Sequence, residues 1–187
     1  MRKIYLVMAL MISIGGMAFA AIASPGFKPG AIDEKKYFIG IPENMEQIQV
    51  KETESQSYDF AFKDKANRYE IRYIMFVEDG QMADVATQAG FWAYLVSMNI
   101  AGDEKAIKNA SKFKDEDVKA EFDADYGSTI FIADSASDYA SGYKYIMANF
   151  YYKKGVGLMC QTILFNDLAI VKTEEFNGIF HTFKFLE

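Results

Sequence analysis

The sequence predicts an α+β domain, in which an antiparallel sheet carries helices on its faces, and three observations lead to this fold class. Apolar and polar residues alternate over 58–63 and again over 69–75, with a polar turn at 64–67 between them. The period then changes to steps of three and four residues, as in an amphipathic helix. Three more alternating segments follow, and a second helical pattern precedes a short aromatic strand. Runs of strands separated by helices in this way are typical of a mainly antiparallel sheet.

The first half of the domain is expected to hold strands at 37–41 and 58–75, with a turn and a weak strand over 43–57 between them. Pro42 ends the first strand, and the alternation over 58–75 predicts an antiparallel hairpin. The helix that follows has one apolar stripe, with Asp84 as N-cap and Gly102 as C-cap. Its stripe is Val85, Ala89, Trp92, Val96 and Ile100. We expect Trp92 to be the main anchor of this helix in the core.

The second half begins with a charged segment, 105–125, in which a short helix is expected at 117–122. Strands are expected at 128–134, 143–153 and 156–165, and the tight turn at 153–155 makes the last two neighbours. Asp167 is placed to cap a final helix, and residues 182–186 form the closing strand. The buried face of the final helix is expected to be Leu168, Val171, Phe176, Ile179 and Phe180.

The N-terminal segment, residues 1–23, has the pattern of an export signal. Arg2 and Lys3 precede an apolar run that is too short to cross a membrane, and small residues at Ala20 or Ala23 fit signal peptidase. Residues 24–35 then read as a flexible leader, and residues 36–187 as a single domain. We therefore expect an exported, soluble protein in the periplasm or outside the cell, with no stable membrane insertion after cleavage. The formal net charge of −6 argues against nucleic acid as a partner.

The order of elements and several short motifs resemble the PsbP-like superfamily. The motifs are Phe38-Ile39-Gly40-Ile41-Pro42, Gly142-Tyr143-Lys144-Tyr145, Tyr151-Tyr152-Lys153-Lys154-Gly155 and Phe180-His181-Thr182-Phe183-Lys184-Phe185. The resemblance implies an α/β/α sandwich and a non-catalytic binding or assembly role, as in an exported bacterial member. It brings no particular partner with it. The export signal excludes the nuclear role that one member of the superfamily has.

Catalysis would depend on Cys160 and His181, the single cysteine and the single histidine of the chain. A nucleophile and its base must be hydrogen-bonded neighbours. We expect instead a packed thiol on one face of a strand and a surface histidine. Serine catalysis would need the same His181, and the sequence has no Gly-x-Ser-x-Gly motif. One His and one Cys also serve zinc poorly.

An acidic cluster at 115–125 is the densest group of potential cation ligands. Asp123 and Asp125 begin a segment like a calcium loop, but Ser128 stands where the turn needs glycine and Asp134 replaces the bidentate glutamate. An ordinary solvated acidic face is therefore expected, with weak calcium binding as the alternative. The cluster is Asp115, Glu116, Asp117, Glu121, Asp123 and Asp125.

A tyrosine-rich hairpin is the best candidate for an interaction surface in the sequence. Tyr143, Tyr145 and Tyr151 are expected on one strand face and Tyr152 on the other, which predicts one row outside the core beside a lysine pair. The alternative is that one row packs beneath a helix. The candidate interaction residues are Tyr143, Tyr145, Tyr151, Tyr152, Lys153 and Lys154.

These observations favour an exported, non-catalytic binding or accessory protein that acts through contacts with a protein partner and holds no cofactor. A small-ligand or calcium-binding periplasmic protein is the alternative. A small hydrolase is the third candidate.

Overall fold

The computed structural model describes residues 27–29, 36–77 and 85–186. The predicted signal segment, 1–23, and Asp84, the predicted N-cap, lie outside the described residues. Part of the predicted flexible leader is in the fold, because β1 (Phe27–Pro29) pairs antiparallel with β2 (Tyr37–Pro42).

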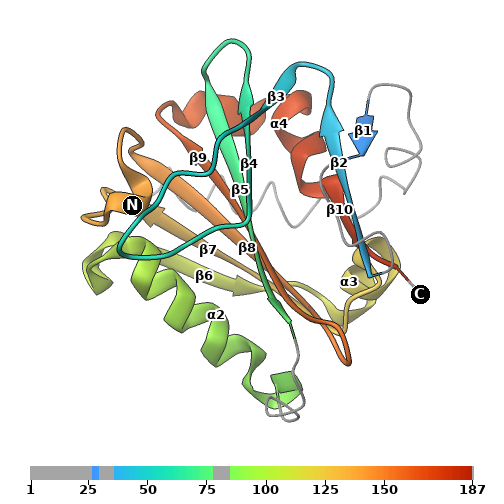
Figure 1. The fold of residues 1–187 in the computed structure, drawn as a ribbon. Coiled ribbons are helices and arrows are strands. Elements are labelled where there is room, and N and C mark those ends of the chain that lie inside the picture. Colours follow the sequence, from blue (N-terminus) through green and yellow to red (C-terminus); the bar gives the residue numbers. More distant parts are fainter. Residues whose placement is uncertain (1–26, 30–35, 78–84, 187) are drawn as a thin grey trace.

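A seven-stranded antiparallel sheet forms the centre of the molecule (Figure 1). In spatial order its strands are β3 (Met45–Ile48), β4 (Phe60–Asp64), β5 (Tyr69–Val77), β9 (Gly157–Phe165), β8 (Tyr145–Lys153), β7 (Tyr126–Ala133) and β6 (Ile107–Lys112). β5, β9, β8 and β7 are long and make the centre of the sheet. A second, three-stranded sheet has the order β1, β2, β10 (Phe183–Phe185).

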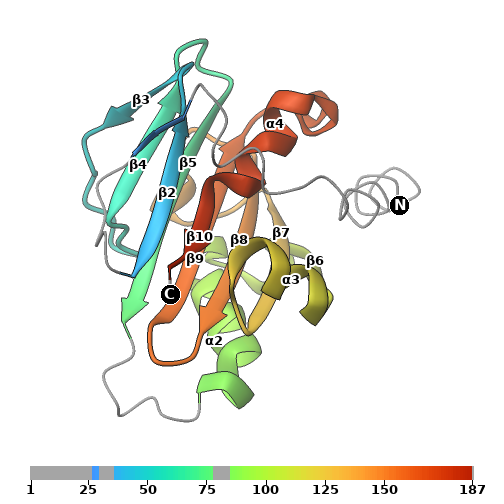
Figure 2. The same cartoon turned by 90° about the vertical axis from the view of Figure 1, so that its right-hand side faces the viewer.

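Two separate cores cover the two faces of the large sheet. α2 (Val85–Ala101) packs on one face against β7 and β8. α3 (Asp115–Phe122), α4 (Glu174–Ile179) and the β2–β10 pair cover the other face. Figure 2, which looks from the right of Figure 1, brings this second layer to the front. The expected fold class, an α+β sandwich with a central antiparallel sheet between helical layers, is confirmed.

The predicted hairpin is confirmed, with Phe62 opposite Ile71 in the β4–β5 register. β8 and β9 pair directly around the predicted turn, with Lys153 opposite Gly157. Gly102 follows α2 with a φ of +69°, and its N–H donates to the Met98 carbonyl, as expected of a C-cap.

The helices differ from the expectation in three respects. Trp92 is half-buried at the edge of the core, whereas Ala89, Ala93 and Val96 are buried, so small residues and not Trp92 anchor α2; the side chain of Val85 lies outside the described residues. α3 begins at Asp115. The final helix is two elements, a 3₁₀ helix η4 (Leu168–Lys172) and α4, because Thr173 is extended and caps α4.

The predicted buried face of the final helix is consequently wrong at Leu168. Asp167 caps η4 by accepting from Ala169 N, and Leu168 then points outward and is exposed. Phe176 and Ile179 are buried as expected, and Phe180 is half-buried.

Candidate functional site

The tyrosine-rich hairpin lies inside the molecule. Tyr151 and Tyr152 are each 1% exposed, on opposite faces of β8. Tyr151 stacks on Phe113 and Phe183 beneath α3, and Tyr152 belongs to the core on the α2 side. The expectation that one row lies outside the core is wrong for these two residues, because both faces of the sheet are covered.

Tyr143 and Tyr145 are half-buried, and they lie on opposite sides of the sheet. Tyr145 begins β8 and stacks on Phe131, on the side of α4. Tyr143 precedes the strand, so the alternation does not reach it, and its hydroxyl donates to Glu70 Oε2 at 2.9 Å on the α2 side. The expected common face of Tyr143 and Tyr145 is therefore wrong.

The two lysines of the hairpin also differ from each other. Lys153 Nζ lies 2.5 Å from Asp123 Oδ2 and donates to the Leu186 carbonyl at 2.8 Å, so it ties the hairpin to α3 and to the C-terminal segment. Lys154 is exposed. Of the six predicted interaction residues, Lys154 alone has an exposed side chain.

Asp123 and Asp125, the two candidate calcium ligands of the acidic cluster, are bound by lysines. Asp123 is the left-handed residue that ends α3, and Lys119 and Lys153 contact its two oxygens at 2.7 and 2.5 Å. These two lysines hold the pKa of the Asp123 carboxyl below its usual range, because both donate to the ionised form. Asp125 Oδ2 accepts from Lys154 N at 2.8 Å. A calcium ion at Asp123 would have to displace two lysines.

Cys160 and His181 lie on opposite faces of the large sheet. Cys160 is buried in the α2-side core, and this burial raises the pKa of its thiol well above the usual value. His181 is on the other side, where its ring stacks on Phe122 and its Nδ1 lies 3.3 Å from Glu121 Oε2. The two side chains cannot form a nucleophile and base pair in this fold.

A buried ion pair joins β5 to two loops on the α2 side. Arg72 Nε donates to Glu70 Oε1 at 2.6 Å, and both side chains are almost fully buried. The guanidinium also lies between the rings of Tyr58 and Tyr139, at 4.7 Å from each centroid, and donates to the Tyr139 carbonyl. Two partners of this charge, the Glu70 carboxylate and the Tyr139 carbonyl, come from separate segments of the chain, so the cluster ties these segments together.

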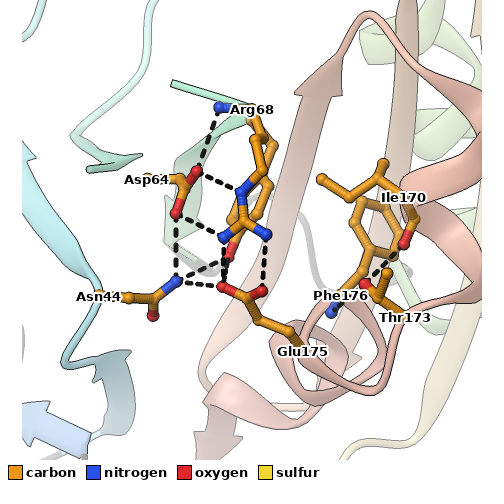
Figure 3. A network of polar contacts seen from close by, with 8 residues as sticks. Asn44, Asp64, Arg68, Ile170, Thr173, Glu175 and Phe176 are labelled. Atoms are coloured by element: carbon orange, nitrogen blue, oxygen red, sulfur yellow. Dashed lines mark hydrogen bonds and ion pairs between the residues drawn. The ribbon is translucent and has the colours of Figure 1, made fainter. Parts of the chain in front are cut away.

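A second polar cluster connects the β4–β5 hairpin to α4 (Figure 3). Asp64, with a buried carboxylate, accepts from Arg68 Nε at 2.8 Å, and Arg68 reaches on to Glu175 Oε1 at 2.6 Å. Asn44 donates to both carboxylates. These contacts lower the pKa of Asp64, chiefly through the hydrogen bond from Arg68.

The outer face of α2 is the largest group of exposed apolar side chains on one described element. Phe91, Tyr94 and Leu95 are 59%, 39% and 36% exposed, and we call these three residues the α2 apolar face. α2 contains no charged residue over its 17 positions. A surface helix normally carries charged residues on its outer side, and a helix that is apolar all round is normally buried.

The sequence carries a signal for this face that lies outside the inward apolar stripe of α2. A count of charges over 85–101 gives none, although charged residues make up 25% of the chain. The inward stripe explains only one side of such a helix. The absence of charge on the outer side as well is therefore the sequence signal for this face.

Comparisons with known proteins define the class by its fold. No protein-family model matches the sequence, and a search of curated proteins finds no match. The architecture is similar to that of a solved PsbP structure. The solution structure of cyanobacterial PsbP from Synechocystis sp. PCC 6803 matches with a TM-score of 0.54 at 14% identity, over 91% of this chain and 96% of that one. This similarity establishes the fold, as the resemblance in the sequence implied.

Within the described residues, we find no helix with the length and apolar character needed to span a membrane.

Proposed function

We propose that the chain is an exported, non-catalytic binding protein that acts through protein contacts, and that the α2 apolar face is its contact surface. The observation that carries the proposal is the exposure of Phe91, Tyr94 and Leu95 on a helix without charge. When a partner removes adjacent large apolar side chains of this kind from water, the free energy falls by about 25 cal/mol per Å² of apolar surface buried. Clustered exposed apolar residues mark interaction sites, whereas scattered ones need no explanation.

The other exposed large apolar residues are scattered. Val50, Val77 and Leu168 each lie on a different element or loop, and none of them is on α2. On α2, by contrast, Phe91 and Leu95 are one helical turn apart, with Tyr94 beside them. This concentration favours α2 over the rest of the described surface.

The internal pairing of the polar groups also supports a contact function. The Arg72 and Glu70 side chains satisfy each other inside the core, and the carboxylate of Asp123 is bound by lysines. Cys160 and His181 are separated by the sheet. The calcium and hydrolase alternatives therefore have less support than contact through α2.

Export rests on the pattern of residues 1–23, a cationic start followed by a short apolar run and small residues. Mass spectrometry of the protein recovered outside the cytoplasm tests it. A mature chain that begins at Ala21 or Ser24 is expected. An intact chain that begins at Met1 in the membrane fraction would contradict export of a cleaved protein.

The contact function is tested by two matched leucine substitutions. Leu95 and Leu168 are both 36% exposed, but Leu95 is on α2 and Leu168 is on η4, so Leu95→Glu and Leu168→Glu differ only in the surface they change. Leu95→Glu is expected to remove the chemically cross-linked adducts that the wild-type protein forms in the producing cell. Leu168→Glu is expected to keep them.

Both variants should keep the fold, because substitutions at exposed positions change stability by about 0.5 kcal/mol or less. Melting temperatures within about 2 °C of the wild type would show this. If both variants form the wild-type adducts equally, the α2 apolar face is not the contact surface. If the wild type forms no adduct, a contact function itself is contradicted.

A further inference from the structure

We infer that the occupant of the α2 apolar face is a second copy of this chain, with the two α2 helices packed antiparallel about a two-fold axis. The inference rests on the proposed function, which makes this face the contact surface, and it names the partner. A two-fold contact joins the same surface patch of both copies. Each residue of the patch therefore packs against the same residue of the other copy, or against residues near it.

The distribution of charge is the first argument, because α2 is a surface on which two copies can meet without placing like charges together. The chain has a net charge of −6, so two copies repel each other over most orientations. α2 has no charge over 17 residues, so its outer side can meet the same surface without placing like charges together. A helix adapted to a partner of opposite charge would carry complementary charged residues, because these speed encounter and fix the register.

The spacing of the face is the second argument. Phe91, Tyr94, Leu95 and the half-buried Met98 follow one another at i, i+3, i+4 and i+7. This is the pattern by which one helix packs its side chains between those of another. Tyr94 and Leu95 lie near the middle of α2, where an antiparallel two-fold axis brings each residue close to its own counterpart.

The charged flank of α2 is the third argument. Lys112 lies over the Tyr126 ring, and a side-chain carbon at Gly90 would lie 3.1 Å from the Tyr126 hydroxyl, so Lys112 flanks the first half of α2. Glu104 accepts a hydrogen bond from Tyr94 and directly follows the helix, so it flanks the second half. An antiparallel pair places the first half of one helix over the second half of the other. Lys112 of each copy, whose Nζ lies 2.7 Å from Asp115 Oδ1 of its own chain, then lies beside Glu104 of the other copy.

Strand pairing between copies is a competing mode of contact, and the β6 edge of the large sheet disfavours it. β6 is the edge strand beside α2, and it carries exposed Lys108 and Lys112 and a register shift between Ile107 and Asn109. Edge lysines and bulges are the usual features that prevent edge-to-edge pairing. The helix face is therefore a better route to a symmetric contact than the β6 edge.

The size of the contact sets the expected strength. A helix of 17 residues is about 25 Å long and about 10 Å wide, so the face that it offers, about 250 Å², is smaller than the area of about 800 Å² per partner that a stable interface buries. The flank at Glu104 and Lys112 must contribute, and the pair is expected to dissociate in the micromolar range, between about 1 and 100 µM.

A cysteine at Leu95 tests the geometry. The wild type has one cysteine, Cys160, which is buried, so it provides a background without surface thiols in the described residues. Leu95→Cys is expected to form a disulfide-linked dimer under mild oxidation. Leu168→Cys, equally exposed on η4, is expected to stay monomeric on a non-reducing gel.

Sedimentation equilibrium of the full chain, as recovered from the producing cell, tests the equilibrium without a cross-link. The wild type and Leu168→Glu are expected to dimerise with the same dissociation constant, and Leu95→Glu is expected to weaken the dimer at least about 100-fold, since a charge without a partner is buried. A wild type that remains monomeric at about 100 µM would overturn the inference.

The two proposals fail in different ways. If the wild type is monomeric but its adducts in the cell still depend on Leu95, the second copy is wrong and the contact surface stands. If the wild type is monomeric and forms no adduct that depends on Leu95, both proposals are contradicted.

Discussion

Arg72 carries its charge inside the core on the α2 side, and three neighbours make this possible. Glu70 neutralises it at 2.6 Å, and Tyr58 and Tyr139 hold the guanidinium between their rings. Tyr58 also accepts from Lys51 N, and Tyr139 bonds with Thr162, so the loops on both sides are fixed around one charge. Single residues thus connect segments that lie far apart in the sequence.

Substitution of Arg72 by methionine is expected to lower the free energy of unfolding by about 3 to 5 kcal/mol, because it leaves the Glu70 carboxylate buried without its partner. Urea denaturation measures this loss. The double variant Arg72→Met with Glu70→Gln is the control, and it should be less destabilised than Arg72→Met alone. A loss below about 1 kcal/mol in the single variant would show that the pair is not needed.

Acid stability is expected to depend on Asp64. Its pKa in the folded state lies below the unfolded value because Arg68 donates to the carboxylate. The resulting stability is therefore present above the unfolded pKa, about 3.9, and is lost as the pH falls through the folded pKa. Urea denaturation between about pH 2 and 5 should show a smaller pH dependence for Arg68→Met than for the wild type. Parallel curves would contradict this assignment.

The sequence alone could not predict the burial of the tyrosines of the β8–β9 hairpin. Alternation correctly places Tyr151 and Tyr152 on opposite faces of one strand, but it cannot tell whether each face is covered. Both are, by α3 and by the α2-side core. Tyr143 is different, because it precedes the strand and the alternation stops at Tyr145.

At the scale of elements, two glycines offer matched tests of how the α3 layer packs. A side-chain carbon at Gly127 would lie 2.7 Å from Val118 Cγ2 and 2.9 Å from Phe113 Cδ2, so β7 and α3 meet without space for a methyl group. Gly127→Ala is expected to cost about 1 to 3 kcal/mol. Thermal or urea unfolding measures it.

Gly178 in α4 is the control, since nothing lies within 4 Å of an added side-chain carbon there. Gly178→Ala is expected to stabilise the protein by about 0.5 to 1 kcal/mol, because alanine is the better helix residue. Equal effects of the two substitutions would show that close packing of α3 on β7 does not limit Gly127.

Elements with a strong apolar pattern were predictable, and those with a weak one were not. The β4–β5 and β8–β9 hairpins follow directly from alternation and turn residues. β6 was missed because its segment, 107–112, has few apolar residues and its side chains are only half-buried or exposed. The break between η4 and α4 was also missed, because Thr173 interrupts a pattern that otherwise continues.

At the scale of the whole molecule, the sequence predicted the sandwich but not the contact surface that we propose. The order of strands and helices was sufficient for the fold class, which the match to cyanobacterial PsbP supports independently. The contact surface depends on which apolar residues remain after both faces of the sheet are covered. On α2 these are Phe91, Tyr94 and Leu95; the sequence shows that the helix has no charge, but the packing is needed to show which of its apolar residues stay exposed.

The central claim is that the α2 apolar face is covered when the protein works, and the rate of thiol labelling at Phe91→Cys tests it most directly. The only native cysteine is buried, so the introduced thiol gives the signal. In the producing cell, Phe91→Cys is expected to react with a maleimide at least about tenfold more slowly than in the dilute purified protein, whereas Leu168→Cys reacts at the same rate in both. Equal rates for Phe91→Cys in the cell and in dilute solution would contradict the claim.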